Sequence, residues 1–378
     1  MRLLLIARVN ARSTRLSGVF AKLKGQVAAL SSAGADVGFL HMDGNRQVLA
    51  RWDDAVKALM YEREWGPVAK QGEQEIFWQG AAEAARLWAP DTVLLRYERM
   101  YEAPVLVTFL ESLPRQTVRL LEFPTLPYAG EIADPALVAA DRANRDRLPP
   151  HVSQALSPSP VAAVSGMPVA RFDNRIDLSA PEITLGQGPL SGPDGVLHLL
   201  VVSFLESYKG IDRALAGLAD APDVPARLTV VGEGSERPAL MRQAERLNIT
   251  DRVTFTGPLS GAALHPLLAR ASAGVGSIGM HRKGVTAGSP LKGRLYMACG
   301  LPVIVSYDDP LLERAGPIIR VPADDSPLPV AQIAREVNAL TLSGATRQSI
   351  AGTARPEIGW EGFARWLLNL TRRAAQAS

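Results

Sequence analysis

The sequence predicts an α/β protein of two doubly wound, Rossmann-like domains that face a central cleft. Short apolar runs alternate with amphipathic segments along the whole chain, which is typical of parallel sheets covered by helices. A length of 378 residues exceeds one ordinary core and suits two. Residues 179–195 are rich in Pro, Gly and Ser, as linkers often are. We therefore expect domains over residues 1–178 and 196–356, and a closing segment over residues 357–378.

Four apolar runs in the first half predict buried strands, at residues 3–9, 37–41, 93–97 and 118–123. Apolar side chains at helical spacing predict helices at residues 19–31, 74–87 and 104–113. The apolar run at the amino terminus is short and is cut by Arg8, so it indicates a first strand and not a signal peptide.

The second half repeats this alternation. Strands are predicted at residues 197–204 and 227–231, with helices at residues 210–219 and 238–247. The alternation continues through residues 253–256, 264–271, 273–278, 291–298 and 302–306. Residues 360–375 predict a last helix with one apolar face. In such domains, ligands bind beyond the carboxyl ends of the strands.

Composition narrows the class of protein. A net charge of +3 is compatible with anionic ligands but too small to indicate nucleic acid binding. The single cysteine, Cys299, excludes an intrachain disulfide. No apolar stretch approaches the roughly 18–20 residues that span a bilayer. We therefore expect a cytoplasmic protein, soluble or peripheral at the inner face of the plasma membrane.

Lysine is scarce, with seven among 41 basic residues. Five of the seven lie in or beside Gly-rich segments, at positions 22, 24, 209, 283 and 292. Codon bias and chance explain this distribution as well as function does. The functional interpretation is that compact ammonium charges are kept where phosphates must be bound.

One motif in the second half is misleading. Gly274-Val-Gly276-Ser-Ile-Gly279 matches the dinucleotide-binding pattern, which follows a strand and opens a helix. Here the glycines lie inside the predicted strand, and no helix start follows. We therefore do not expect NAD or FAD.

Two other loops are better candidates for binding anions. Lys209-Gly210 lies where a strand gives way to a helix, so backbone N–H groups and a cation meet at one point. Val231-Gly-Glu-Gly234, with Glu233, follows the next strand. Its glycines let the backbone turn tightly or approach a ligand, and an ordinary turn explains them equally well.

The most basic loop comes later in the chain. His281-Arg-Lys-Gly284 brings His281, Arg282 and Lys283 together just before Ser289-Pro-Leu-Lys292. Ser289 predicts a helix N-cap, Pro290 suits the first helical position, and Leu291 and Lys292 follow in the first turn. A diphosphate fits this much positive charge. A solvated basic loop before a capped helix is the alternative.

Four stretches of the second half, taken in order, resemble the retaining GT-B glycosyltransferases of family GT4. They are Tyr208-Lys-Gly-Ile-Asp-Arg213, Leu228-Thr-Val-Val-Gly-Glu-Gly234, Asp251-Arg-Val-Thr-Phe-Thr-Gly257 and Ser289-Pro-Leu-Lys292 with Tyr296-Met-Ala-Cys-Gly-Leu-Pro-Val303. Each stretch is weak alone, and their order and spacing make the set specific.

The first half resembles the branch that makes capsular and exopolysaccharides. The similar stretches are Ser17-Gly-Val-Phe-Ala-Lys22 with Gln26-Val-Ala-Ala-Leu30, and Leu121-Glu-Phe-Pro-Thr-Leu-Pro-Tyr-Ala-Gly-Glu131. Asn174-Arg-Ile-Asp177 and the Trp360-Glu helix are also similar to the family, whose last helix crosses back onto the N-terminal domain.

The resemblance implies a GT-B fold and a retaining glycosyltransferase. The donor would be a nucleoside-diphosphate sugar of the UDP or GDP type, and the acceptor a polysaccharide or lipid-linked oligosaccharide. No cofactor and no metal are implied, because cations do the metal's work on the leaving diphosphate. By position, Lys209 would contact the diphosphate, the backbone of residues 289–291 would cap its phosphates, and the Gly18 loop would face the donor.

Three positions depart from the family pattern. Leu295 stands where the family usually has a glutamate that contacts the ribose, and Ala287 stands where many relatives have a second glutamate near the sugar. Phe204 replaces a phosphate-binding arginine of the family. Losing a carboxylate partner for a sugar hydroxyl costs about 1–3 kcal/mol of binding. The departures therefore predict poor donor affinity, a different donor mode, or lost activity.

The acceptor side is predicted at two strand ends of the N-terminal domain. Arg96 and Glu98 follow one strand, and Glu122, Tyr128 and Glu131 follow the next. Carboxylates accept hydrogen bonds from sugar hydroxyls, and aromatic rings pack on sugar faces. Ordinary surface charge explains each residue singly.

Membrane contact and two other function classes remain open. Arg8, Arg12, Arg15, Lys22 and Lys24 suit an anionic inner leaflet, or else the donor cleft. A non-catalytic relative would bind a nucleotide sugar or glycan as a scaffold, which the three departures favour. An epimerase of the same fold would need acid and base carboxylates on the donor side, where the sequence offers none.

Overall fold

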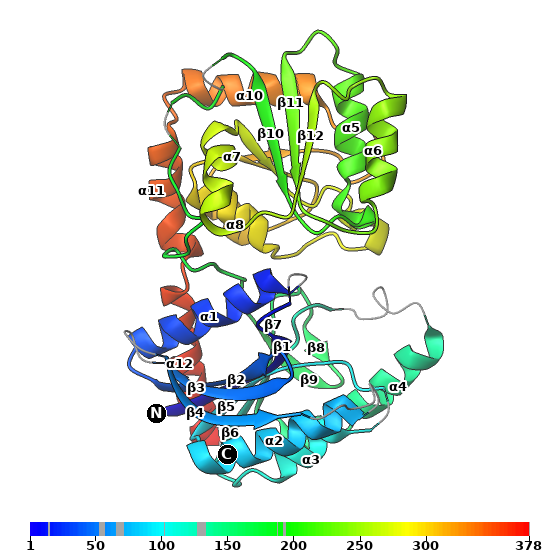
Figure 1. Cartoon of the computed structure of the whole chain (residues 1–378). Coiled ribbons are helices and arrows are strands. Elements are labelled where there is room, and N and C mark those ends of the chain that lie inside the picture. Colours follow the sequence, from blue (N-terminus) through cyan, green and yellow to red (C-terminus); the bar gives the residue numbers. More distant parts are fainter. Residues whose placement is uncertain are drawn as a thin grey trace. The chain divides into compact units, whose positions relative to one another are not determined.

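The computed structural model of the chain describes residues 1–13, 16–52, 57–65, 72–101, 103–126, 134–186, 188–191 and 194–377. The chain divides into two compact units, Met1–Asp173 with Trp360–Ser378, and Asn174–Gly359 (Figure 1). Each unit contains parallel strands covered by helices, so the predicted α/β class with two parallel-sheet domains is confirmed. Residues 179–195 fall in the second unit.

Within the described residues, the first unit holds a nine-stranded sheet in the order β4-β3-β2-β1-β5-β6-β7-β9-β8. The strands are β1 (Arg2–Asn10), β2 (Asp36–Asp43), β3 (Arg46–Trp52), β4 (Lys57–Glu64), β5 (Thr92–Arg96), β6 (Val118–Glu122), β7 (Gln154–Ser157), β8 (Ala163–Val164) and β9 (Met167–Arg171). β1 pairs in parallel with β2 on one side and with β5 on the other. The strand order therefore reverses between β1 and β5.

The sequence prediction missed β3 and β4, which extend the sheet in antiparallel fashion. Asp43-Gly44 turns the chain from β2 into β3, with Gly44 at a φ of 66°. This dipeptide is a recognised hairpin signal. An irregularity in the pairing between Leu49 and Ala50 disturbs the alternation of apolar side chains that would otherwise mark a strand.

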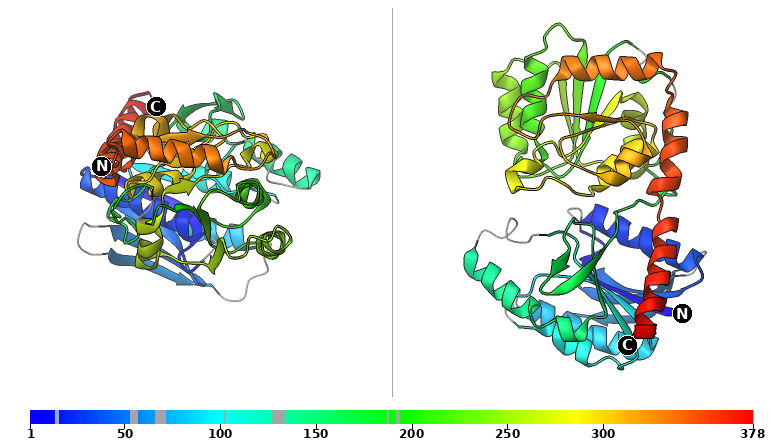
Figure 2. Two further views of the ribbon diagram at one scale, coloured as in Figure 1. Left: turned by 90° about the horizontal axis from the view of Figure 1, so that it is seen from above. Right: turned by 180° about the vertical axis from the view of Figure 1, so that it is seen from behind.

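Helices cover both faces of this sheet. They are α1 (Ser17–Ser32), α2 (Glu73–Trp88), α3 (Val105–Glu111), α4 (Pro135–Arg145) and α12 (Glu361–Ala377). Side chains of β1 point alternately to the two faces of the sheet. Leu3 and Leu5 pack against α1 and α12 on one face, and Leu4 and Ile6 pack against α2 and α3 on the other. Figure 2 shows α12 against the same face as α1, and its Phe363 and Leu367 are buried there.

The second unit holds a six-stranded parallel sheet in the order β12-β11-β10-β13-β14-β15, counted over the residues that the structure describes. Its strands are β10 (Leu197–Val202), β11 (Ala226–Val231), β12 (Val253–Gly257), β13 (Ala273–Val275), β14 (Val303–Val305) and β15 (Ile318–Arg320). β10 lies between β11 and β13. The strand order of this sheet reverses between β10 and β13, which is where doubly wound sheets bind their ligands.

Seven helices within the described part of the second unit surround its sheet. They are α5 (Ile211–Ala219), α6 (Arg237–Arg246), α7 (His265–Arg270), α8 (Leu291–Ala298), α9 (Pro310–Ala315), α10 (Val330–Leu342) and α11 (Arg347–Ile358). One core lies under α5, α6 and α10, and another under α7, α8 and α9. β13 ends earlier than predicted, and the one-turn 3-10 helix η6 (Met280–Lys283) follows it, so no dinucleotide-type helix opens after Gly276.

Candidate functional site

Two loops meet at the carboxyl ends of β10 and β13. The backbone N–H of Ile278 donates to the carbonyl of Lys209 at 3.1 Å. Gly210 adopts a left-handed φ of 72°, and a Cβ at this position would lie 2.7 Å from the backbone nitrogen of Gly279. Only glycine fits this close approach. The crossing holds Lys209 and the η6 segment at the point where the strand order reverses.

Three lysines gather around this crossing. The ammonium groups of Lys209 and Lys283 lie 4.3 and 3.7 Å from the centre of the Tyr208 ring. Tyr208 and Lys209 belong to the 3-10 helix η4 (Ser207–Lys209). Lys292, in the first turn of α8, donates to the Ser203 hydroxyl at 3.3 Å. Among the described residues, none of the three ammonium groups forms an ion pair.

The three charges repel one another. Burial and, to a smaller extent, the positive charge of Lys283 lower the pKa of Lys209 to about 8, against an opposing effect of Glu206. Burial and the charge of Lys209 also hold the pKa of Lys292 well below its usual value. Among the described residues, no carboxylate forms an ion pair with this cluster, and a polyanion would supply that counter-charge. We call Lys209, Lys283 and Lys292 the lysine cluster.

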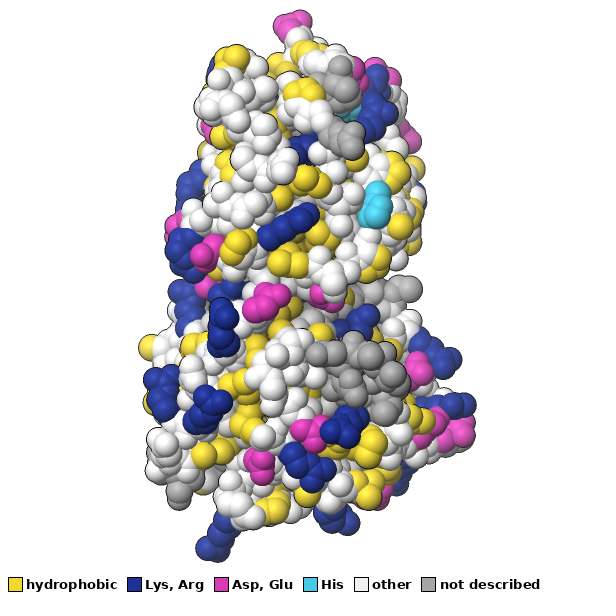
Figure 3. Space-filling view, turned by 90° about the vertical axis from the view of Figure 1, so that its left-hand side faces the viewer, with side chains coloured by type: hydrophobic (Ala, Val, Ile, Leu, Met, Phe, Trp, Pro, Cys, Tyr) yellow, Lys and Arg dark blue, Asp and Glu magenta, His cyan; other side chains and the backbone are white. Residues whose placement is uncertain are grey.

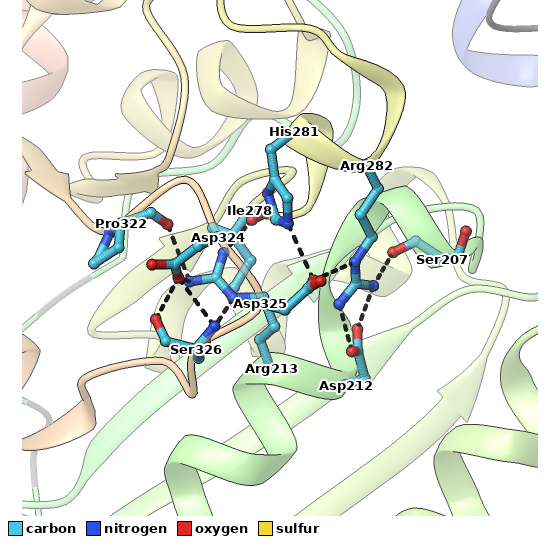
Figure 4. Close-up of polar contacts among 10 residues, drawn as sticks. All are labelled: Ser207, Asp212, Arg213, Ile278, His281, Arg282, Pro322, Asp324, Asp325 and Ser326. Atoms are coloured by element: carbon cyan, nitrogen blue, oxygen red, sulfur yellow. Dashed lines mark hydrogen bonds and ion pairs between the residues drawn. The ribbon is translucent and has the colours of Figure 1, made fainter.

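Arg282 and His281, predicted with the phosphate-binding residues, point instead toward carboxylates of the protein (Figure 4). Arg282 binds Asp212 through two nitrogens at 2.9 and 2.7 Å, and donates from Nε to Asp325 at 2.7 Å. Nε2 of His281 lies 3.0 Å from the same Asp325 oxygen. These hydrogen bonds hold the pKa of Asp325 below its usual value. The positive charge of Arg282 is therefore already paired, whereas the lysine cluster has no ion-pair partner among the described residues.

Arg213 holds the same loops from beneath. Its buried guanidinium donates to the carbonyls of Ile278, Ser326 and Pro322, the last two at 2.7 and 3.0 Å (Figure 4). Together, Arg213 and Arg282 join the loops after β10, β13 and β15. The lysine cluster therefore stands on a fixed support. The sequence prediction assigned no role to Arg213, and its partners lie 65 to 113 residues away.

The start of α8 differs from the prediction. Pro290 occupies the N-cap position, without a side-chain cap, so the prediction of Ser289 as the N-cap was wrong. The Ser289 hydroxyl accepts hydrogen bonds from Arg294 at 2.7 Å and from the backbone of Asn174 at 2.8 Å, which occupies its oxygen elsewhere. Leu291 and Lys292 open the helix, and the N–H groups of a first turn have no partner within the helix.

A buried ion pair, which sequence reasoning missed, anchors α8. Arg294 and Asp309 are both fully buried, and two hydrogen bonds of 2.5 and 2.8 Å join them. Arg294 also donates to the carbonyl of Asn174 at 2.7 Å. Neither residue lies in a recognisable motif, so the sequence carries no signal for the pair.

The glycine pair after β11 has a structural reason. A Cβ at Gly234 would lie 2.2 Å from the carbonyl oxygen of Leu205, and the N–H of Leu205 donates to the carbonyl of Glu233 at 2.8 Å. The glycines therefore let this loop pack on the loop after β10. The Glu233 side chain is exposed and lies 3.7 Å from Arg237.

The three positions that depart from the GT4 pattern all lie in the second unit. Leu295, on α8, packs against a buried apolar cluster. Ala287 forms a β-bridge with Asp308, and Phe204 is 39% exposed after β10. No carboxylate stands at either glutamate position of the family.

In the first unit, two of the predicted acceptor carboxylates, Glu98 and Glu122, are engaged within the protein. Glu122, at the end of β6, is buried and accepts from Lys22 at 2.5 Å and Gln26 at 3.3 Å. Burial would raise the pKa of Glu122, but the charges of Lys22 and Arg96 outweigh it and lower this pKa. Glu98 accepts from Arg8 at 2.7 and 2.8 Å. Tyr128 and Glu131 lie outside the described residues.

The remaining predicted positions of this unit have different surroundings. Gly18 lies in the first turn of α1 and not in a loop, so that part of the prediction was wrong. It is exposed, and nothing lies within 4 Å of a Cβ there. Arg96 ends β5 and is half-buried. The structure thus brings the predicted lysines of the second unit together, and leaves Arg96 as the predicted acceptor residue without a protein partner among the described residues.

The basic N-terminal stretch is largely paired. Arg12 lies 2.7 Å from Asp43, Lys22 is buried with Glu122, Lys24 is exposed, and Arg15 is outside the described residues. None of the helices in the described part of the chain is long and apolar enough to cross a membrane. On the face in Figure 3, basic side chains are scattered among acidic and uncharged ones. Within the described ranges, no group of three or more His, Cys, Asp or Glu side chains could hold a metal ion.

Comparison with known proteins supports the same fold. Residues 197–336 match the family described as glycosyl transferases group 1. A sucrose-phosphate synthase from Thermosynechococcus elongatus is similar over 100% of both chains, with a TM-score of 0.71 at 17% identity. HepE from Anabaena, solved with UDP and glucose, is similar over 100% of this chain and 99% of its own, with a TM-score of 0.59 at 15% identity.

A third solved structure is the catalytic domain of starch synthase IV from Arabidopsis thaliana, bound to ADP and acarbose. The match covers 99% of both chains, with a TM-score of 0.66 at 10% identity. A search of curated proteins found no match. The chain therefore has the GT-B fold, and the match to the glycosyl transferases group 1 model lies within its second unit.

Proposed function

We propose that this chain is a retaining, metal-independent glycosyltransferase of the GT4-like, capsular and exopolysaccharide type. It moves a sugar from a nucleoside-diphosphate sugar of the UDP or GDP type to a polysaccharide or lipid-linked oligosaccharide. The observation that carries this proposal is the lysine cluster, Lys209, Lys283 and Lys292. Its three ammonium groups have no ion-pair partner among the described residues and stand where the strand order reverses.

A diphosphate supplies the missing counter-charge. In the transfer, the bond between the sugar carbon and the diphosphate oxygen breaks, and the oxygen keeps the electron pair. The acceptor hydroxyl forms the new bond to the same carbon and loses its proton to the leaving phosphate. Negative charge thus grows on the diphosphate in the transition state. Cations held in place beforehand stabilise such charge without reorganising, and this effect is often the largest in catalysis.

The support loops explain why the cluster keeps its geometry. Lys209 and Lys283 sit on one-turn helices whose loops are joined by Arg213 and Arg282. Arg282 is already bound to Asp212 and Asp325, so we infer that it positions the loop and that the lysines bind the phosphates. His281 shares Asp325 and belongs with Arg282.

Similarity to proteins with bound ligands adds support. Anabaena HepE has been solved with UDP and glucose, and the starch synthase with ADP and acarbose. Together with the group 1 domain, they favour a nucleotide sugar as donor and a glycan as acceptor for this chain.

A second candidate function rests on two residues. Leu295 and Ala287 stand where the GT4 pattern has carboxylates for the ribose and the sugar, and Leu295 packs into an apolar cluster. A protein with this change and an intact lysine cluster would bind a nucleotide sugar without turning it over. It would then act as a scaffold in polysaccharide assembly.

The experiment that separates these functions measures release of UDP or GDP from their sugars, with and without an added oligosaccharide acceptor. For the glycosyltransferase, we expect release that depends on the acceptor and is lost in Lys209→Ala. Lys24→Ala, which removes an exposed lysine in the first unit, is the matched control. Folded protein that binds donor but releases nothing with any acceptor would contradict the enzyme and favour the scaffold.

A further inference from the structure

Arg96, at the end of β5, is a cation without a hydrogen-bond or ion-pair partner among the described residues. Its guanidinium makes no hydrogen bond and no ion pair with any residue that the structure describes, and its Nε is buried. β5 lies next to β1, where the strand order of the first sheet reverses. The position is therefore the ligand-binding edge of a doubly wound sheet.

Three carboxylates described at this end of the sheet, those of Glu98, Glu122 and Asp141, are already paired with other cations. Glu122 is the register partner of Arg96 in the neighbouring strand, so the two side chains share a face of the sheet. Lys22 occupies Glu122 at 2.5 Å. Glu98 binds Arg8, and Asp141 binds Arg145 at 2.8 Å.

Among the described residues, this arrangement leaves the positive charge of Arg96 without a carboxylate that pairs with it. Arg96 lowers the pKa of both Lys22 and Glu122, so its charge is felt at that pair, but it does not enter it. An unpaired, partly buried guanidinium is costly, because its N–H donors lose water without gaining acceptors. Proteins keep such groups where a ligand completes them. The planar fork of arginine matches the two oxygens of a carboxylate or phosphate.

We propose that Arg96 anchors an oxyanion on the acceptor, so that the acceptor is an anionic sugar that carries a phosphate or a carboxylate. That the bound anion is a glycosyl acceptor rests on the function proposed above, whereas the presence of an anion site at Arg96 does not. Lys22 is a positioning residue here, because it holds Glu122 and so keeps Arg96 available. The paired Glu98 and Glu122 then have no direct contact with substrate.

The test uses the full chain and calorimetric titration with four probes: glucose, glucose 6-phosphate, glucuronate and inorganic phosphate. Each titration is run with the lysine cluster occupied by saturating UDP or GDP, and repeated in Lys209→Ala. We expect a charged sugar to bind at least tenfold more tightly than glucose. If glucose 6-phosphate and inorganic phosphate bind, the oxyanion is a phosphate, and if glucuronate alone binds, it is a carboxylate.

Variants of Arg96 decide the assignment. We expect Arg96→Gln to lose the preference for charged sugars, and Arg96→Lys to retain part of it, because a point charge replaces a fork. Arg86→Gln is the matched control, since Arg86 is an exposed arginine of the same unit without an ion pair among the described residues. Lys209→Ala should lose the nucleotide and keep the charged sugar, so failure of the donor site is recognised separately.

Two outcomes overturn the proposal. One is that a charged sugar binds Arg96→Gln as tightly as it binds the unmodified protein, or that it binds the unmodified protein no more tightly than glucose does. The other is a clear fall in the melting temperature of unliganded Arg96→Gln. Such a fall would make Arg96 a structural residue, whereas removal of an unpaired cation should leave the melting temperature unchanged or raise it.

Discussion

The Arg282 guanidinium binds the Asp212 carboxylate through both terminal nitrogens, at 2.9 and 2.7 Å, across 70 residues of sequence. The pair joins the η6 segment to the first turn of α5. Because Lys283 follows Arg282 directly, the pair also fixes the direction in which Lys283 leaves the backbone. Arg282, which the sequence places among the candidate phosphate-binding residues, is thus engaged with carboxylates of the protein, next to the candidate ligand Lys283.

Removing Arg282 should loosen this support. We expect Arg282→Ala to lower the free energy of unfolding by about 1–2 kcal/mol, since both side chains are partly exposed and water screens the pair. We also expect weaker nucleotide binding with faster hydrogen exchange in residues 276–284. Arg237→Ala is the control, because Arg237 is 3.7 Å from an exposed Glu233 and should cost little. Equal losses in the two variants would contradict the positioning role.

The buried pair of Arg294 and Asp309 should matter far more for stability. Replacing Asp309 by Asn leaves a guanidinium uncompensated in the interior, which costs about 3–5 kcal/mol. The neighbouring Asp308 forms an exposed pair with Arg320 at 3.1 Å, so Asp308→Asn should change stability by less than about 1 kcal/mol. Urea denaturation of the two variants measures the difference, and similar midpoints would show that the buried pair is not needed.

The backbone crossing at Gly210 gives a third expectation. Gly210→Ala brings a Cβ to 2.7 Å from the nitrogen of Gly279, in addition to the strain of a φ of 72°. Gly284 has a similar φ of 64° but nothing within 4 Å, so Gly284→Ala pays only the strain. That strain costs about 1–2 kcal/mol. Thermal denaturation should therefore show a larger loss for Gly210→Ala, and nucleotide binding should fall in that variant alone.

The pH dependence of nucleotide binding follows from Lys209. Its pKa in the folded protein is about 8, below the model-peptide value of about 10.4. A diphosphate prefers the charged form, so affinity should be constant below pH 8 and should fall as the pH rises above it. The same shift acts on stability in the opposite sense. The unliganded folded protein holds this proton less tightly than the unfolded chain, so its stability gains between about pH 8 and 10.4.

Comparison with Lys209→Met isolates this group from the others that titrate. We expect the variant to bind weakly and to lose the part of the pH dependence that comes from Lys209, while any titration of the buried Lys292 remains. In the unmodified protein, affinity should drop by up to about tenfold per pH unit above the pKa of Lys209. A profile shared by both proteins would assign the pH dependence elsewhere.

The sequence predicted the elements whose signals are local. β1 and β10 each contain a largely apolar run, because both faces of a parallel strand are buried, and such runs are easily seen. Lys209 was predicted as an anion-binding residue because it stands where a strand gives way to a helix, and Lys292 because it lies in the first turn of a helix after a basic loop. β3 was missed because a pairing irregularity breaks its alternation, although Asp43-Gly44 marked the turn before it.

Pairing between distant residues could not be predicted. Asp325 lies 43 residues from Arg282, and Glu122 lies 100 residues from Lys22. Nothing local in the sequence indicates that Asp325 pairs with Arg282 and not with Lys283, or that Glu122 pairs with Lys22 and not with Arg96. Arg282 and Lys283 are adjacent in a basic loop, and only the folded structure separates a positioning residue from a candidate ligand. For the same reason, the sequence did not indicate that Arg96 has no hydrogen-bond or ion-pair partner among the described residues.

Calorimetric titration of UDP and GDP into the full chain at pH 7 shows whether the lysine cluster binds a nucleoside diphosphate. We expect that one of the two binds, that Lys209→Ala and Lys292→Ala each weaken this binding at least tenfold, and that Lys24→Ala leaves it unchanged. Folded protein that binds neither nucleotide, or variants of the lysine cluster that bind as tightly as the unmodified chain, would contradict this expectation.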